Sequence, residues 1–328
     1  MYQKLRLVME MIRFSHTIFA LPFALSAALL AWCVPDRLGE QISFSSLHLV
    51  GILVCMVGAR SAGMAFNRLV DRAIDARNPR TENRHLPSGQ LSVRGVVLFV
   101  IVSVALFVLG TLFFLPNPLP LVLAIPVLGI VFAYSYTKRF TSLAHFWLGM
   151  SLSLAPIATW LALRGTAVIA EPLDLLPALV LGCAVLFWVA GFDIIYACQD
   201  YEFDVAENLK SIPSTLGVRN ALRLAAVSHF VMLFLLAVLP LTFRLGGPVL
   251  PLGPIYYLGL VPITAMLIYE HLVVSHDDLT RVNLAFFQMN AWISGGLMAL
   301  LAVDLLFESH CIRYCSSGVP SQFGLTTG

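Results

Sequence analysis

Three oxygen-bearing side chains recur at helical intervals in the segment 67–75. Asn67, Asp71 and Asp75 stand at positions i, i+4 and i+8, so a helix would place all three on one face. Mg²⁺ in proteins is commonly held by one or two carboxylates together with water and substrate phosphate oxygens. The segment therefore predicts a site for a hard divalent cation, although the same spacing also occurs on the solvated end of an ordinary helix.

A second group of carboxylates lies in the segment 193–204. Asp200 and Asp204 are again four residues apart, and Asp193 precedes Asp200 by seven residues, which predicts a shared helix face. Asp193 falls inside an apolar stretch, where an ionised side chain in a membrane costs about 2.5–3.5 kcal/mol and is usually functional. We therefore predict a second cation site at Asp200 and Asp204, with Asp193 two turns deeper.

Phenolic and basic residues that could bind a diphosphate form a third cluster. Tyr134 and Lys138 are one helical turn apart, and Arg139 follows Lys138. Lys and Arg form charge-assisted hydrogen bonds with phosphate oxygens. Alone, Lys138 and Arg139 would be ordinary residues of a positively charged membrane loop. Beside two acidic motifs, they are predicted to bind the diphosphate.

Arg60 stands within an apolar stretch, seven residues before Asn67, which is about 10 Å deeper by helical rise. Its small neighbours, including Gly58 and Ser61, indicate a packed interior face rather than an arginine that reaches the membrane surface. A buried guanidinium needs a partner, and a carboxylate suits its geometry. Asp193 or the carboxylate of a substrate could be that partner.

The elements that must position these residues are membrane helices. The 328 residues are 59% hydrophobic and 12% charged, with a mean hydropathy of +0.87, whereas soluble domains carry about 25% charged residues. Nine stretches approach the length of about 20 apolar residues that spans a bilayer. They lie near 16–34, 47–66, 95–115, 119–136, 143–163, 175–198, 222–243, 253–274 and 284–307. We predict an all-α polytopic membrane protein with nine transmembrane helices bundled around a central cavity.

The basic residues predict the orientation of this bundle. Of the 20 Lys and Arg residues, 15 fall on one side of the predicted membrane, four on the other, and Arg60 lies within a helix. By the positive-inside rule the N-terminus and the acidic loops are cytoplasmic, so the cavity is expected to open to the cytoplasmic side. Residues 1–308 form one predicted transmembrane domain, and 309–328 a disordered tail. The scattered basic residues give no indication of nucleic-acid binding.

Taken together, these motifs resemble the UbiA superfamily of membrane prenyltransferases. The resemblance rests on the Asn67/Asp71/Asp75 motif, the Asp200/Asp204 motif with Asp193 upstream, the pair Tyr134 and Lys138, and the run from Arg84 through Leu86-Pro87-Ser88-Gly89. The segments 11–16 and 134–141 resemble the branch that prenylates 4-hydroxybenzoate or a dihydroxynaphthoate. Arg68 departs from the pattern, because many members carry an Asp there.

The resemblance implies an enzyme of ubiquinone or menaquinone biosynthesis in a bacterial inner membrane. It would use two Mg²⁺ ions, one at Asn67 and Asp71 with Asp75 near, the other at Asp200 and Asp204. The metal ligands Asp71 and Asp200, with Asp193, would be catalytic. Its substrates would be a polyprenyl diphosphate, bound also by Lys138, Arg139, Tyr134 and Arg72, and an aromatic acid, bound by Arg60, Arg13 and Tyr196.

Two alternatives remain open at this point. Other UbiA-type enzymes, which prenylate haem or chlorophyll-type acceptors, share the acidic motifs. An ion-coupled transporter also carries paired charges within the membrane. A transporter needs polar residues along a path through the membrane, whereas here the ionisable residues gather at one predicted face, which favours an enzyme.

Overall fold

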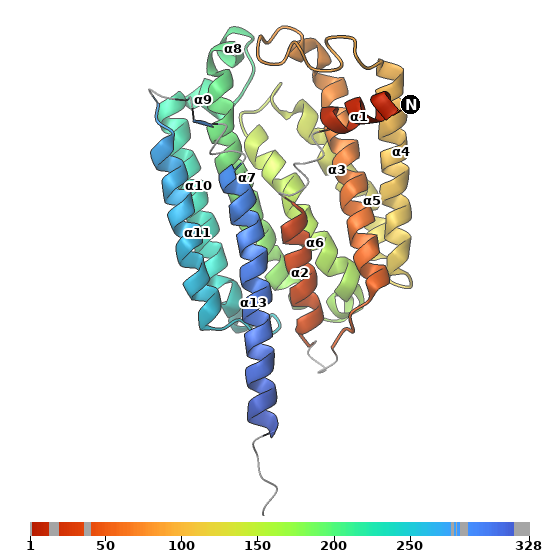
Figure 1. Ribbon diagram of the computed structural model, residues 1–328, viewed down its shortest axis with the longest axis vertical. Coiled ribbons are helices and arrows are strands. Elements are labelled where there is room, and N and C mark those ends of the chain that lie inside the picture. Colours follow the sequence, from red (N-terminus) through yellow and green to blue (C-terminus); the bar gives the residue numbers. More distant parts are fainter. Residues whose placement is uncertain are drawn as a thin grey trace, which may run out of the picture.

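The computed structural model describes residues 2–12, 20–35, 41–276, 279, 281–282 and 288–317. Every regular element within these ranges is a helix, and the long helices run side by side along the long axis of the molecule (Figure 1). The predicted all-α architecture is confirmed. The acidic motifs lie at the end that carries the short helices α1, Tyr2–Met11, α8, Tyr201–Ala206, and α9, Ile212–Leu216 (top of Figure 1). We refer to it as the motif end.

Eight helical stretches among the described residues are long and apolar enough to cross a bilayer. Five of them are α3, Ser46–Asp75; α4, Val93–Thr111, with the short 3₁₀ helix (η) η2, Leu112–Phe114; α5, Leu119–Thr137; α6, Ala144–Ala170; and α11, Pro254–Val273. The others are η3, Pro172–Leu175, continuing through α7, Leu176–Ala197, η4, Cys198–Asp200, and α8; α10, Val218–Val238, with η5, Leu239–Leu245; and the first part of α13, Asn290–Ser317.

The first predicted span corresponds to a shorter helix. This helix, α2, covers Leu21–Cys33 and has 13 residues, fewer than the roughly 20 that cross a bilayer, while residues 13–19 lie outside the described ranges. The number nine therefore stays a prediction. At the other end of the chain, α13 continues to Ser317, beyond residue 309 where the tail was predicted to begin, and residues 318–328 are not described.

The outward surfaces of the bundle are apolar. Large aliphatic side chains are exposed on α4, α5 and α11, among them Leu98, Ile101, Ile125, Leu258 and Leu272. Contiguous exposed apolar surface of this kind is unfavourable in water, and hydrocarbon is the solvent that suits it. The chain is therefore an integral membrane protein.

The central helix of the packing is α7, which lies against α6 and α10. Trp188 and Val189 on α7 are fully buried. At Gly149 on α6, an added Cβ atom would lie 2.3 Å from the carbonyl oxygen of Leu186, so only glycine allows these two helices to approach so closely. This contact fixes the relation between α6 and the part of α7 that carries Asp193.

A fully buried ion pair joins helices at the end opposite the motif end. Arg164 of α6 is 0% exposed and Asp174 of η3 is 2% exposed. The Nε and Nη2 atoms of Arg164 donate to Asp174 at 2.8 and 2.6 Å, and Nη1 donates to the carbonyl of Val34 at 2.6 Å. Trp160 Nε1 also donates to Asp174, at 3.0 Å. The pair thus connects α6, η3 and the segment after α2.

Candidate active site

The first acidic motif lies on the last turns of α3. Asn67, Asp71 and Asp75 occupy one continuous helix, and Asn67 Nδ2 donates a hydrogen bond to Asp71 Oδ2 at 3.1 Å. Asp71 and Asp75 are only 4% and 5% exposed. Two buried carboxylates at the end of one helix require positive partners or ligands.

Basic residues from other elements supply these partners. Lys138 Nζ, at the end of α5, lies 2.8 Å from Asp71 Oδ2, and Arg139 Nη2 lies 3.5 Å from Asp71 Oδ1. Arg84 Nη1, from the loop after α3, lies 2.7 Å from Asp75 Oδ1. The structure therefore brings the predicted residues Lys138 and Arg139 to the first motif, and it adds Arg84, to which the sequence motifs assigned no role.

The second acidic motif does not continue the helix that carries Asp193. The helix α7 ends at Ala197, the 3₁₀ turn η4 ends at Asp200, and Asp204 lies on α8. A 3₁₀ helix has 3.0 residues per turn rather than 3.6, so the continuous face predicted from the seven-residue spacing is wrong. Asp193 consequently contacts α6, whereas Asp200 contacts the loop that follows α3.

That loop connects the two motifs across 120 residues of sequence. Arg80 Nε donates to Asp200 Oδ1 at 2.8 Å, Arg80 Nη2 pairs with Asp200 Oδ2, and Asn78 Nδ2 donates to Oδ1 at 3.1 Å. Burial alone would lower the pKa of Arg80, but the hydrogen bond and charge of Asp200 raise that pKa above its ordinary value. The contact is therefore an ionic one.

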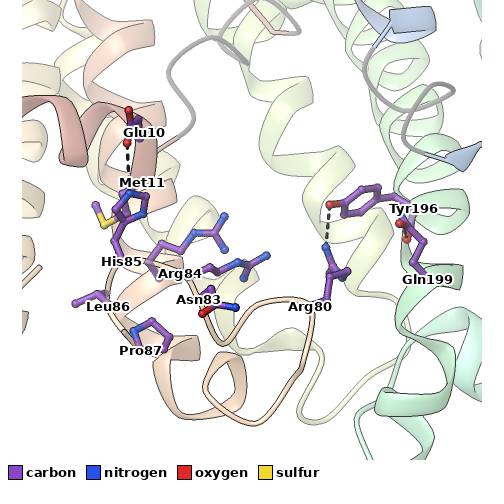
Figure 2. A pocket seen from close by; sticks show the side chains of 11 residues that line it. Glu10, Met11, Arg80, Asn83, Arg84, His85, Leu86, Pro87, Tyr196 and Gln199 are labelled. Carbon is purple, nitrogen blue, oxygen red and sulfur yellow. Dashed lines mark hydrogen bonds and ion pairs between the residues drawn. The ribbon is translucent and has the colours of Figure 1, made fainter. Parts of the chain in front are cut away.

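A polar pocket of about 410 Å³ opens between this loop and the ends of α1, α3 and α7. Its lining consists of Glu10, Met11, Arg68, Arg80, Asn83, Arg84, His85, Leu86, Pro87, Tyr196 and Gln199. Figure 2 shows Arg80 reaching the phenol of Tyr196, with Nη1 2.9 Å from the hydroxyl oxygen. Three arginines line this pocket, but Arg68 and Arg84 lie within 4.0 Å of Asp75, Arg80 pairs with Asp200, and Glu10 also belongs to the lining.

An apolar cavity of about 340 Å³ lies among α3, α4, α5 and α6. Most of its lining is aliphatic or aromatic and includes Phe107 and Phe114, but Arg60, Asn67 and Tyr134 also border it. Asn67 therefore belongs both to the first acidic motif and to this cavity. An apolar cavity that extends to a cluster of charged side chains suits a substrate with an apolar tail and an anionic head.

Arg60 borders this cavity without a charged partner. Its Nε is buried and has no hydrogen-bond partner in the described part of the chain, and no ion pair joins its guanidinium to a described carboxylate. Asp193, one of the two partners considered from sequence, is instead bound to His145, with Nδ1 2.7 Å from Asp193 Oδ2. A guanidinium in such surroundings is available for an anionic group of a ligand.

The oxygen ligands at the motif end fit Mg²⁺ that is partly held by a substrate. Within the ranges that the structure covers, no three His, Cys, Asp or Glu side chains are grouped closely enough to bind a metal by themselves. Mg²⁺ needs only one or two carboxylates when phosphate oxygens and water complete its shell. Asp75 Oδ2 is buried with no hydrogen-bond partner among the described residues and only Arg68, at 4.0 Å, nearby. Such an oxygen suits a cation.

The remaining predicted site residues are placed as follows. Asp204 lies near the Ser211 side chain, and Tyr196 belongs to the polar pocket with Arg80. Arg72 is exposed and makes no side-chain hydrogen bond or ion pair with another described residue. Arg13 lies outside the described residues.

Sequence reasoning gave no role to Asn78, Arg80, Arg84 or His145, although Arg84 belongs to the run that carries the resemblance. For the three loop residues a signal existed, because they directly follow Asp75 and two acidic motifs need compensating charge. His145 gives no such signal, since it is a single histidine near the start of an apolar helix.

Comparisons with known proteins place this chain among membrane prenyltransferases. The model of the UbiA prenyltransferase family matches residues 20–293. The 4-hydroxybenzoate octaprenyltransferase of Nitrosomonas eutropha is 31% identical over 276 residues, which cover 84% of this chain and 88% of that protein.

Solved structures show the same fold. The apo structure of a UbiA homolog from Aeropyrum pernix K1 has a TM-score of 0.75 and 30% identity, covering 89% of this chain and 98% of that one. A UbiA homolog from Archaeoglobus fulgidus bound to DMAPP and Mg²⁺ has a TM-score of 0.60 and 20% identity, covering 90% and 99%.

Proposed function

Because the chain belongs to the UbiA prenyltransferase family, we propose that it transfers a polyprenyl group from its diphosphate to an aromatic acid. The acceptor would be 4-hydroxybenzoate or a dihydroxynaphthoate, and the product a precursor of ubiquinone or menaquinone. The named relative acts on 4-hydroxybenzoate, which favours the first acceptor. The apolar cavity beside the acidic motifs suits the prenyl chain of the donor.

The donor's diphosphate would bind where the acidic motifs and the basic residues meet. Asn67 and Asp71, with Asp75 near, would hold one Mg²⁺, and Asp200 and Asp204 would hold another. When bound, Mg²⁺ neutralises the charge that develops on the leaving diphosphate. The Archaeoglobus fulgidus homolog, which binds DMAPP and Mg²⁺, supports the use of a divalent cation.

Basic residues would stabilise the diphosphate further. Lys138, Arg139 and Arg80 pair with Asp71 and Asp200 in the present structure. A cation that takes over these carboxylates would leave the three side chains free to donate charge-assisted hydrogen bonds to phosphate oxygens. Tyr134 borders the cavity beside Asn67 and could donate its hydroxyl. Arg72 stays a proposed ligand that no contact in the structure supports.

The observation that carries the choice of acceptor is the unpartnered Arg60 guanidinium in an apolar cavity. A carboxylate of the acceptor would satisfy it with two parallel hydrogen bonds. Arg60 lies about 10 Å below Asn67 by helical rise, so the acceptor would lie beneath the diphosphate. Arg13 and Tyr196 are further proposed acceptor contacts.

The chemistry follows from this arrangement. The C–O bond to the diphosphate breaks, and its electron pair leaves with the diphosphate. The ring carbon ortho to the acceptor's hydroxyl then forms a bond to the allylic carbon and gives up its proton to the departing diphosphate as the ring regains aromaticity. Asp193 would accept a hydrogen bond from that hydroxyl and enrich the ring in electrons. The apolar cavity excludes water, which would otherwise capture the allylic cation.

An assay of the purified protein tests the proposal. Mg²⁺, a polyprenyl diphosphate and a panel of acceptors would be combined, and the products identified by mass spectrometry. The panel would contain 4-hydroxybenzoate, a dihydroxynaphthoate and matched phenols that lack the carboxylate. We expect prenylated acids to dominate. Product from a haem or chlorophyll-type acceptor alone, or no preference for the carboxylate, would overturn the proposal.

The orientation is part of the same proposal. The excess of Lys and Arg at the motif end favours a cytoplasmic active site in a bacterial inner membrane. In a variant lacking the native cysteines, a Cys introduced at Ser88, which is exposed in the loop after α3, should react with impermeant reagents only in inverted vesicles. Reaction in intact cells would show that the loop faces the outside and that the proposed orientation is wrong.

A further inference from the structure

His145 contacts the acid that the reaction would use on the acceptor. It lies near the start of α6, is 5% exposed, and its Nδ1 is 2.7 Å from Asp193 Oδ2. This is the one side-chain hydrogen bond that Asp193 makes with the described residues. Asp193 Oδ1 therefore stays available for a ligand, while Oδ2 is held.

A backbone amide determines which nitrogen of His145 carries the proton. The N–H of Ile212 donates to His145 Nε2 at 3.4 Å, so Nε2 must present its lone pair. In a neutral imidazole the other nitrogen then carries the hydrogen. Nδ1–H therefore donates to Asp193. Ile212 is the first residue of α9, where an amide has no carbonyl partner within its own helix.

The turn that holds His145 also touches both acidic motifs. Ser211, next to Ile212, lies near the Asp204 carboxylate of the second motif. The amide of Lys210 donates to the carbonyl of Lys138 at 2.8 Å, and Lys138 is the residue that pairs with Asp71 of the first motif. The segment 210–212 thus links His145 to the proposed diphosphate site.

We propose that His145 is a positioning residue that holds Asp193 in the orientation needed by the acceptor. The inference rests on the function proposed above. Through Ile212, it also ties the orientation of Asp193 to the turn beside the second acidic motif, so that the two substrate sites share one support. The competing interpretation is that His145 only fills space and stabilises the packing of α6 against α7.

Two substitutions separate these interpretations. His145→Gln keeps an amide that can donate to Asp193 and an oxygen that can accept from Ile212, whereas His145→Leu keeps neither bond. We expect His145→Leu to lower kcat by about 10- to 100-fold, as is typical when a group that orients a functional residue is lost. The KM for the prenyl diphosphate should change little, and His145→Gln should restore most of the rate.

A double-mutant cycle with Asp193→Asn provides the second readout. If His145 acts through Asp193, His145→Leu should add little to the loss that Asp193→Asn already causes. His48→Leu is the matched control, because His48 lies at the opposite end of α3, stacked on Phe114 with ring centroids 5.6 Å apart. Thermal unfolding in detergent would first show that each variant is folded at the assay temperature, and only folded variants would be compared.

The outcomes distinguish the two proposals. If the native enzyme prenylates no aromatic acid, the proposed function fails and the role of His145 fails with it. If it does prenylate them, but His145→Leu retains full kcat or its effect adds to that of Asp193→Asn, only the role of His145 is overturned. A loss that His145→Gln does not relieve would also count against positioning by hydrogen bonds.

Discussion

Two arginines lie within the helical bundle, and their surroundings are opposite in kind. Arg164, at one end, is 0% exposed and bonds to both oxygens of Asp174 and to backbone carbonyls. Arg60, toward the motif end, borders a cavity, and its Nε has no partner among the described residues. Burying a charge costs several kcal/mol unless partners compensate it. The comparison separates a charge that completes the fold from one that awaits a ligand.

The largest expected effect concerns the carboxylates at Arg60's end of the molecule. We expect Asp71→Ala or Asp200→Ala to lower turnover by at least about 1,000-fold, since the charge of the leaving diphosphate would lose several kcal/mol of stabilisation. Steady-state assays with added Mg²⁺, and with EDTA in place of Mg²⁺, measure this.

Glu202 offers the matched control for this experiment. It is an exposed carboxylate on α8 between Asp200 and Asp204, so Glu202→Ala should leave turnover nearly unchanged. Undiminished activity in EDTA, or in either motif variant, would contradict the metal assignment. The end of the molecule that carries Arg60 could then no longer be called the functional one on this ground.

For the Arg164–Asp174 pair we expect a loss of stability instead. Arg164→Met would leave the Asp174 carboxylate buried without its cation, which typically costs about 3–5 kcal/mol. We expect the free energy of unfolding to fall by about that amount, while kcat per folded molecule stays the same. Reversible unfolding in detergent measures the first quantity, and assays at a temperature where the variant is folded measure the second.

The matched variant Asp174→Asn completes this test. It keeps the shape of the side chain but removes the charge, so it should also destabilise the protein without altering KM for either substrate. A specific rise in one KM, with stability preserved, would show that the Arg164–Asp174 pair belongs to a binding site after all.

Arg60 should give the reverse result. Arg60→Met removes a charged hydrogen bond to the acceptor, which is worth about 1.5–3 kcal/mol, or roughly 10- to 150-fold in affinity. We expect KM for the aromatic acid to rise by that factor and KM for the prenyl diphosphate to stay nearly constant. Kinetics that vary each substrate separately measure both. If both KM values move together and the unfolding temperature falls, Arg60 is structural like Arg164.

The contrast between these arginines was only half visible in the sequence. Arg60 could be identified because it interrupts an apolar helix seven residues before Asn67. Arg164 is one of the four basic residues on the other side of the predicted membrane, and nothing nearby in the sequence indicates that it contacts Val34 and Asp174. Length and hydropathy predict helices because each helix satisfies its own backbone hydrogen bonds. Partners that come from other helices leave no local pattern.

In the candidate site too, the features that depend on local spacing could be predicted, and the contacts between different helices and loops could not. The column on α3 follows from helical spacing, and Asn67 and Asp71 do touch, whereas the second motif does not form the face that its spacing predicted. The bonds from Arg80 to Asp200 and from His145 to Asp193 join residues 120 and 48 positions apart, so they depend on tertiary packing. The 3₁₀ turn Cys198–Asp200 also escaped prediction, because one such turn is too short to leave a periodicity of its own in the sequence.

The smallest expected effect comes from an ion pair that is neither buried nor in a cavity. Arg77 Nη2 and Glu207 Oε2 are 2.7 Å apart and join the loop after α3 to the end of α8, with side chains 56% and 29% exposed. Water and salt screen such a pair, and both side chains lose rotamer freedom in forming it. We expect Arg77→Gln to change the free energy of unfolding by less than about 1 kcal/mol.

The effect of Arg77→Gln on catalysis shows whether this exposed ion pair matters for turnover because of the two segments that it joins. If the pair is only a surface contact, kcat/KM for both substrates should change by less than about fivefold, which corresponds to 1 kcal/mol, and Glu207→Gln should behave in the same way. Assays at low and at high salt would show little difference between variant and native protein. A much larger loss in both variants would mean that the two loops must be held together for turnover. The criterion used above, that a charged side chain with all its partners in the protein is structural, would then fail at this end of the protein.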